Sequence, residues 1–187
     1  MKWLILFSVG VLSWTLLEYL IHRFLGHKES RKGIIKKEHS RHHQEAHYFA
    51  PLSGKLVLAA IVFLASWLIF FLLFGPIGGW SFAAGLAFMY AMYEITHRRF
   101  HVKDPLLGYG LRMRKHHFYH HFRNPKVNHG VTTALWDRIF GTYQPVDKVP
   151  VPGSMKMVWL SDRNGKLKEA YRHHFIVGRE RNKKYSD

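Results

Sequence analysis

Fifteen histidines and no cysteine occur in this chain of 187 residues, and ten of the histidines fall into four short clusters. Imidazole is the commonest metal ligand in proteins, and it suits iron, zinc, copper and nickel. Because one metal ion takes about four to six ligands, ten imidazoles predict a site for two metal ions. The ten are His22 and His27, His39, His42 and His43, His97 and His101, and His117, His120 and His121.

The spacing within each cluster is compatible with ligands carried on helices. Residues at i, i+3 and i+4 share one helix face, and the clusters at 39–43, 97–101 and 117–121 follow this spacing. His22 and His27 are five residues apart, about 140° around an ideal helix, so they require a helix end or a bulge. The 97–101 cluster reads HRRFH and lacks the glutamate of the HExxH motif, which excludes a zinc-protease motif there.

Three apolar blocks predict membrane helices at about 3–21, 56–74 and 80–96. A helix needs about 20 apolar residues to cross the hydrocarbon core of a bilayer. The chain is 48% hydrophobic yet has a net charge of +16, and its charges lie mainly between the blocks. Gly75-Pro76 followed by residues 77–79 predicts a tight connection, so the second and third helices should form an antiparallel hairpin. We interpret the first block as a retained helix, because its apolar stretch exceeds that of a signal peptide.

The basic residues predict the orientation of these helices. All Lys and Arg except Lys2 lie at 21–55 or after residue 97, which the positive-inside rule makes cytoplasmic. All four histidine clusters then face the cytoplasm, at a bacterial inner membrane or the endoplasmic reticulum. No recognition motif accompanies the charge, so we expect no nucleic-acid partner. The absence of cysteine excludes disulfides, Cys-ligated zinc and iron–sulfur clusters.

The sequence therefore predicts an all-α integral membrane protein with one domain over residues 1–187. About three transmembrane helices should carry a cytosolic helical cap, made of residues 22–55 and 97–143, which holds a dinuclear metal site. Short helices are expected at 112–122 and 131–143. Residues 144–187 are expected to form a basic C-terminal tail, with a strand or an interfacial patch at 155–160.

Two carboxylates lie within the apolar helices, where a charge is costly and usually functional. Glu18 precedes His22 by four residues, and Glu94 precedes His97 by three. We hypothesise that each accepts the spare N–H of its histidine and so fixes the orientation of the ring. The alternative is a carboxylate at the membrane interface that water reaches.

In their order and spacing, these motifs resemble the fatty acid hydroxylase / sterol desaturase superfamily of membrane-bound oxygenases. The resemblance rests on H-X4-H at 22–27, H-X2-HH at 39–43 and again at 117–121, and H-X3-H at 97–101. The lead-in EYxxHR at 18–23 and the segment NHGVTTALWDRIFGT at 128–142 also fit. It covers about residues 18–143.

The resemblance implies two iron ions held by the ten clustered histidines, with zinc as a substitute in a purified sample. It implies O₂-dependent hydroxylation, or desaturation, of a lipid such as a fatty acyl chain or sterol that enters from the bilayer. Electrons would come from an external donor, either cytochrome b5-like or ferredoxin-like with its reductase. Two alternatives stay open: a carotenoid ring hydroxylase, and a metal-binding membrane protein without catalysis.

Four further residues are expected to act behind the ligands. His129 stands where the family often has an aromatic residue, and it is either an added ligand or a residue that holds water. His116 is an alternative to His117, although the H-X2-HH register favours His117. Asp137 bonds a ligand histidine or braces the cap, and His47 supports the site or lies on the surface. The sequence gives no oligomeric state.

Overall fold

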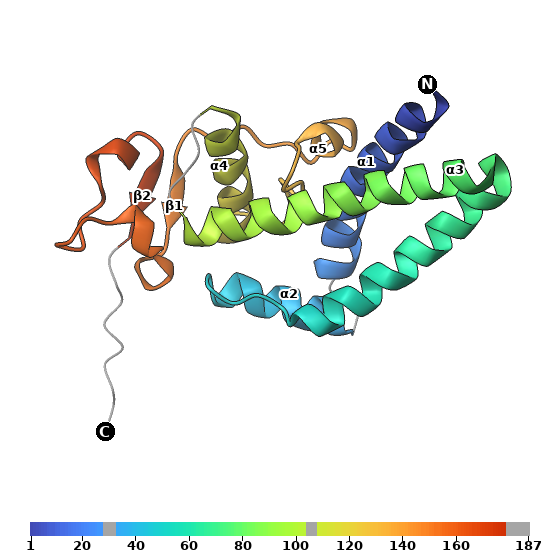
Figure 1. Ribbon diagram of the computed structural model, residues 1–187. Coiled ribbons are helices and arrows are strands. Elements are labelled where there is room, and N and C mark those ends of the chain that lie inside the picture. The colour runs from blue at the N-terminus through green and yellow to red at the C-terminus, as the bar shows by residue number, and fades with distance from the viewer. Residues whose placement is uncertain (28–32, 104–107, 179–187) are drawn as a thin grey trace.

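The computed structural model describes residues 1–27, 33–103 and 108–178, and these are mostly helical (Figure 1). The main elements are α1 (Lys2–Leu20), the π-helix η1 (Ile21–Gly26), α2 (Ile34–Gln44), α3 (Leu52–Val102), α4 (Tyr109–Phe122), α5 (Leu135–Ile139), β1 (Val149–Val151) and β2 (Phe175–Val177). Short 3₁₀ turns η2 (Gly153–Met155), η3 (Val158–Leu160) and η4 (Glu169–Tyr171) lie between the strands. The expectation of an all-α chain is wrong in one respect, because β1 and β2 pair as a small parallel sheet.

The long helix α3 is a hairpin of two antiparallel arms, 52–74 and 76–102, as Figure 1 shows. Gly75 makes the bend with φ 75° and ψ −175°, a backbone conformation that glycine adopts without a steric penalty. Pro76 follows, where its fixed φ suits the first turn of the returning arm. Across the hairpin, the rings of Phe70 and Phe82 stack at 3.6 Å. The expected hairpin is present, but residues 77–79 are helical and the connection is Gly75 alone.

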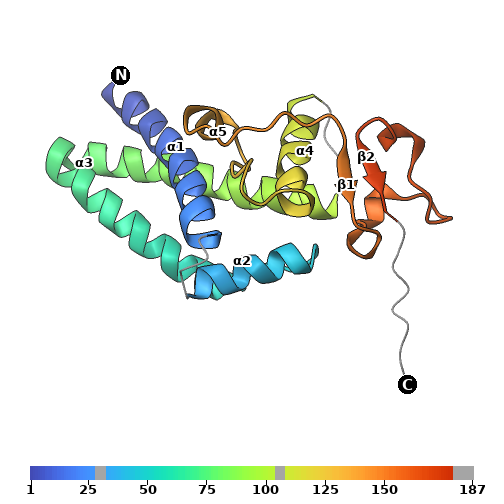
Figure 2. The ribbon, with the colours of Figure 1, turned by 180° about the vertical axis from the view of Figure 1, so that it is seen from behind.

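Helix α1 packs across α3 at a point where the two backbones touch (Figure 2). A Cβ atom at Gly10 would lie 2.2 Å from the Phe82 carbonyl oxygen, and one at Gly85 would lie 2.0 Å from that of Phe7. Small residues allow such close helix crossings in membrane proteins. Trp14 and Leu86 are buried beside the crossing. The glycines therefore fix the position of α1 along α3.

Two helical stretches, Lys2–Gly26 and Leu52–Val102, are long and apolar enough to cross a membrane. The second contains both arms of the hairpin and so includes the third expected helix. Large apolar side chains on it are exposed, among them Leu72 at 73% and Trp80 at 66%. Apolar surface of this extent is typical of contact with lipid. The described residues thus have the surface of a membrane protein.

Residues 144–178 do not form the expected tail, because they fold against α4 and the end of α3. Met157, Trp159, Leu160 and Phe175 are buried there with Phe118 of α4. The Trp159 indole N–H donates a hydrogen bond to the His101 carbonyl oxygen at 3.1 Å. Three of these residues fall in the stretch 155–160 that was expected to be a strand or an interfacial patch, but Val158–Leu160 form the 3₁₀ turn η3, and Trp159 and Leu160 pack into the fold. The fold of the whole segment could not be predicted, because its apolar residues follow neither a helix nor a strand period. Residues 179–187 of the expected tail lie outside the described residues.

Candidate metal centre

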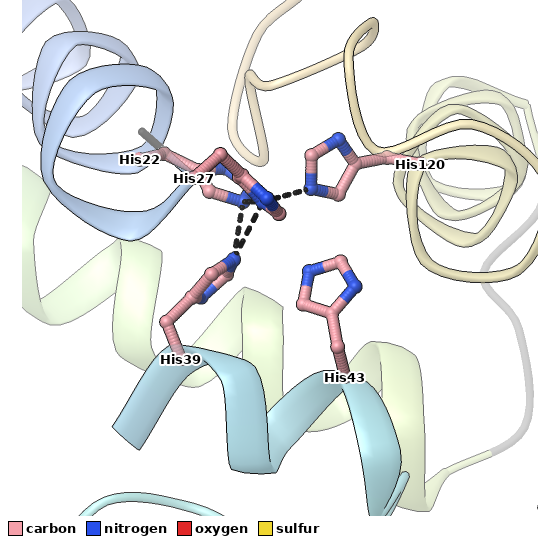
Figure 3. A group of neighbouring side chains, drawn as sticks. All are labelled: His22, His27, His39, His43 and His120. Carbon is pink, nitrogen blue, oxygen red and sulfur yellow. Dashed lines mark hydrogen bonds between the residues drawn. The ribbon is translucent and has the colours of Figure 1, made fainter. Parts of the chain in front are cut away.

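The ten clustered histidines meet in two groups of five. Within each group, one ring nitrogen from every member lies within 4.8 Å of the others. The first cluster, drawn in Figure 3, comprises His22, His27, His39, His43 and His120. The second cluster comprises His42, His97, His101, His117 and His121. The structure therefore brings together every residue that the sequence marked as a metal ligand.

The sequence motifs and the spatial clusters do not coincide, because the two H-X2-HH motifs are each divided. On α2, His39 and His43 are four residues apart and face the first cluster, while His42 faces the second. On α4 the division is reversed, with His117 and His121 in the second cluster and His120 in the first. Residues at i and i+4 lie almost in line along a helix, and the i+3 residue points to one side. Helices α2 and α4 thus each contribute histidines to both clusters.

The pair His22 and His27 reaches the first cluster through a change of helix type. Residues Ile21–Gly26 form the π-helix η1 at the end of α1. A π-helix closes its hydrogen-bonded turns between residues five apart, so a five-residue spacing places side chains on neighbouring turns. The helix end or bulge that the spacing required is therefore this π-turn.

The ring nitrogens converge closely within both clusters. In the first, Nε2 of His27 lies 2.7 Å from Nε2 of His39 and 2.8 Å from Nε2 of His120. In the second, His42 and His97 approach to 3.0 Å through the same atoms. The clusters also touch each other, since the rings of His43 and His121 are parallel at 4.0 Å. The two clusters are thus in contact, and their ring nitrogens converge at two separate points, one in each cluster.

Burial keeps these imidazoles neutral. It lowers the pKa of His27 and of His42 to about 4, and that of His43 to about 2. The pKa of His120 is also lowered well below its ordinary value, first by burial and then by neighbouring histidines. A neutral imidazole offers a lone pair to a metal ion. The point in each cluster where the unprotonated nitrogens converge therefore suits a divalent cation.

Several ligand candidates are oriented by backbone carbonyl groups. The Nδ1 atom of His42 lies 2.6 Å from the Tyr48 carbonyl oxygen, and that of His120 lies 2.7 Å from the Val127 carbonyl oxygen. Nδ1 of His22 contacts the His129 carbonyl oxygen in the same way. A hydrogen bond at Nδ1 fixes the tautomer and leaves Nε2 free to bind metal. Sequence analysis missed these partners because backbone groups carry no sequence signal.

The hypothesis for Glu18 is wrong in its partner. Glu18 accepts the N–H of Val131 at 2.5 Å and the N–H and hydroxyl of Thr132 at 3.0 and 2.7 Å. It therefore holds the segment that contains the His129 carbonyl, the group that orients His22. The four-residue spacing of Glu18 and His22 suggested that the two side chains are neighbours. It could not show that Glu18 binds a loop more than 110 residues away in the sequence.

The hypothesis for Glu94 is also wrong in its partner. The Glu94 carboxylate accepts a hydrogen bond from the Lys55 ammonium group at 2.6 Å, within an ion pair between the two arms of α3. His97 instead stacks against Tyr93, with ring centroids 5.6 Å apart. Glu94 thus links the second arm of α3 to the first arm near its start.

Asp137 is a buried junction and not a direct partner of any clustered histidine. Its carboxylate accepts the backbone N–H groups of His129 and Gly130, both at 2.8 Å, and the Thr142 hydroxyl at 2.7 Å. His116 contacts the same carboxylate at 3.0 Å. Burial alone would raise the pKa of Asp137, but the bonds from His116, Thr142 and Gly130 outweigh it and lower the pKa. Asp137 therefore braces the loop after α4. This agrees with the second of the two roles expected for it, which was to brace the cap.

The remaining histidines singled out by sequence take different places. His116 belongs to neither cluster, whereas His117, which the H-X2-HH register favoured, lies in the second. His129 also lies outside both sets, yet it is only 2% exposed and its ring borders the first cluster. Its centroid lies 5.1 Å from that of His120 and 5.6 Å from that of His22. His47 is exposed and contributes to neither cluster.

The fold and the site define a class of helical membrane protein in which apolar helices carry a buried double cluster of histidines. The family model described as "Fatty acid hydroxylase" matches residues 7–142, which span most of α1 and all of α2 to α5. The chain belongs to the fatty acid hydroxylase family.

Individual relatives agree with this assignment. A dihydroceramide fatty acyl 2-hydroxylase of Arabidopsis thaliana is 36% identical over 72% of this chain, and a fatty acid 2-hydroxylase of Rattus norvegicus is 38% identical over 78%. A solved structure of full-length scs7p, in which only the hydroxylase domain is visible, is 28% identical, with a TM-score of 0.61 over 75% of this chain. The chain spans 59% and 41% of the two relatives and 55% of the solved chain.

Proposed function

We propose that this protein is a membrane-bound oxygenase that hydroxylates carbon 2 of a fatty acyl chain, either as a free acid or within a ceramide-like lipid. The observation that carries the proposal is the division of ten buried histidines into two five-membered clusters beside apolar helices. The relatives supply the substrate class, since those named above are fatty acid and fatty acyl 2-hydroxylases.

The residues present fit two metal ions, one in each cluster, and we propose that both are iron. The donor set supports this assignment, since it consists of neutral imidazoles with no carboxylate among the described members. Zinc suits the same nitrogens and can replace iron in a purified sample. When bound, iron supplies the activation of O₂, and the balanced reaction converts C–H, O₂, two electrons and two protons into C–OH and water.

The protein's own contribution is orientation and the exclusion of water. Four members of the second cluster, His42, His101, His117 and His121, are buried in the fold. Three of the first, His27, His39 and His43, are partly exposed. We infer that the acyl chain and small molecules approach from the side of the first cluster. Closing the second cluster from solvent protects a reactive site from side reactions.

The membrane arrangement forms part of the proposal. We propose three membrane crossings, by α1 and by the two arms of α3, with the histidine clusters at the cytoplasmic surface. The exposed apolar side chains of these helices and the basic residues beyond them support this topology. An electron donor with an acidic docking face, cytochrome b5-like or ferredoxin-like, would be attracted to the basic surface.

The test is expression of the chain in a host that lacks 2-hydroxylated lipids, together with a competent electron donor, followed by lipid mass spectrometry. We expect fatty acyl chains that carry one added oxygen at carbon 2, and no such product with His120→Ala. A hydroxylated carotenoid ring would favour the carotenoid alternative. Abundant iron-loaded protein with an unchanged lipid profile would favour metal binding without catalysis and would contradict the proposal.

A further inference from the structure

We propose that His129 is the hydrogen-bond acceptor for a water molecule bound within the first cluster, which would make it a positioning residue for the small ligand at that metal. The inference rests on the proposed function, because it assumes that the cluster holds a metal ion. It concerns a residue outside both five-membered sets.

The backbone of His129 is fixed from two sides. Its N–H donates to Oδ1 of Asp137 at 2.8 Å, and its carbonyl oxygen contacts Nδ1 of His22. The neighbouring residue Gly130 donates its own N–H to Asp137 at 2.8 Å. With both peptide groups held in this way, the imidazole has little freedom to move away from the first cluster.

The His129 ring lies against the first cluster, and its centroid is as far from the rings of the members as these are from one another. Its centroid is 5.1 Å from that of His120, 5.6 Å from that of His22 and 5.7 Å from that of His27. Pairs inside the cluster span a similar range, from 4.4 Å for His22 and His120 to 6.4 Å for His39 and His120. His129 nevertheless falls outside the set of five convergent nitrogens. Its place is at the rim of the cluster, beside the position of a metal ion and not at its centre.

The hydrogen bonds of the ring leave one nitrogen unsatisfied. Nε2 of His129 faces the Lys126 carbonyl oxygen at 3.3 Å, so this nitrogen carries the proton as the donor. Nδ1 then bears a lone pair, and it is buried without a hydrogen-bond partner in the part of the chain that the structure describes. An unsatisfied buried acceptor costs free energy unless water or a ligand supplies a donor. A water molecule on a metal ion held by the first cluster would have a proton to donate and would satisfy this nitrogen.

Azide tests the proposal, because it displaces water from a metal and has no proton to donate. The probe is the full-length protein loaded with cobalt(II), titrated with azide and followed by its visible absorption bands. The variant is His129→Phe, which keeps a flat ring and removes the acceptor. The matched control is His173→Phe, since His173 is exposed and outside both clusters.

We expect His129→Phe to keep two metal ions and to bind azide about fivefold more tightly than the wild type, since the water loses one hydrogen bond. The control should bind azide as the wild type does. If His129→Phe fails to fold, His129→Leu removes the same acceptor with less bulk, and its azide affinity carries the test.

Three results would overturn the inference while leaving the proposed function intact. Unchanged azide affinity would mean that His129 does not hold the water, and weaker azide binding would mean that the ring donates a proton. Loss of one metal ion would make His129 a ligand. A wild-type protein that binds no metal ion would remove the proposed function and this inference together.

Discussion

Glu18 and Thr132 are joined by two hydrogen bonds, although they lie far apart in the sequence. The backbone N–H of Thr132 donates to Oε1 at 3.0 Å and its hydroxyl donates to Oε2 at 2.7 Å. The connection ties helix α1 to the loop whose His129 carbonyl orients His22. A carboxylate that looked like a direct support of one histidine therefore acts through a loop.

Replacing Glu18 by glutamine should weaken this connection. The amide oxygen would accept the two backbone N–H groups without the strength that a carboxylate charge gives these bonds, and the Thr132 hydroxyl would have to turn to accept from the new NH₂ group. We expect Glu18→Gln to lower the free energy of unfolding by about 1–3 kcal/mol and to reduce metal occupancy of the first cluster. Thermal unfolding and metal analysis measure both effects. Glu94→Gln is the matched control, because it alters a partly exposed carboxylate that pairs with Lys55 and contacts Tyr90. A larger loss in Glu94→Gln would contradict this account.

Asp137→Asn should destabilise the loop after α4. The carboxylate accepts bonds from two backbone N–H groups, the Thr142 hydroxyl and His116, and an amide cannot accept all four. Bonds to a buried charge are worth about 1.5–3 kcal/mol each, so the loss should equal or exceed that in Glu18→Gln. Chemical unfolding in detergent measures it. Stability equal to that of the wild type would show that Asp137 does not brace the loop.

Single ligand substitutions should separate the two clusters. His120→Ala removes a member of the first cluster and His42→Ala a member of the second, so each should reduce bound metal from about two ions to about one. The double variant should bind close to none. Mass spectrometry of the purified protein for metal content gives the readout, with His173→Ala as the control. Two ions retained in both single variants would mean that these histidines are not ligands.

The metal-free protein should lose stability as the pH falls. Burial lowers the pKa of His27 and His42 to about 4 and that of His43 to about 2, while an unfolded histidine titrates near 6.5. Below that value the unfolded chain binds more protons than the folded chain, so folding becomes less favourable from about pH 6.5 down to pH 4.

Melting temperatures across this range, with and without bound metal, test the expectation. Bound metal competes with protons for the same nitrogens and should move the loss to lower pH. A metal-free melting temperature that stays constant between neutral pH and about pH 5 would contradict the neutral state of the clusters.

The folded C-terminal segment should support the second cluster. The Trp159 ring packs against Phe118 and Phe175, and its N–H bonds the carbonyl oxygen of His101. Trp159→Ala should cost about 3–5 kcal/mol, and Trp159→Phe, which removes mainly the hydrogen bond, about 1 kcal/mol. Thermal unfolding compares the two. Equal stability of Trp159→Ala and the wild type would mean that this segment does not stabilise the fold.

The sequence predicted those features that depend on local spacing. The i, i+3 and i+4 relations marked eight of the ten clustered histidines, and the H-X4-H pair at 22–27 marked the other two. The apolar blocks marked α1 and both arms of α3. It could not predict that His42 and His120 separate from their motif neighbours, because this depends on how α2 and α4 are oriented relative to the other histidine-bearing helices. The partners of Glu18 and Asp137 escaped for a related reason, since both bind backbone N–H groups in a loop that carries no spacing signal.

The crossing of α1 and α3 at Gly10 and Gly85 has a consequence for the distance between the two histidine clusters. The continuation of α1 carries His22 and His27, and the end of α3 carries His97 and His101. A methyl group at either glycine would force the two backbones apart, and rigid helices would transmit that displacement to the ligands at their ends. The spacing of the two histidine clusters is therefore adjustable from within the apolar helices, without changing a single one of the ten clustered histidines.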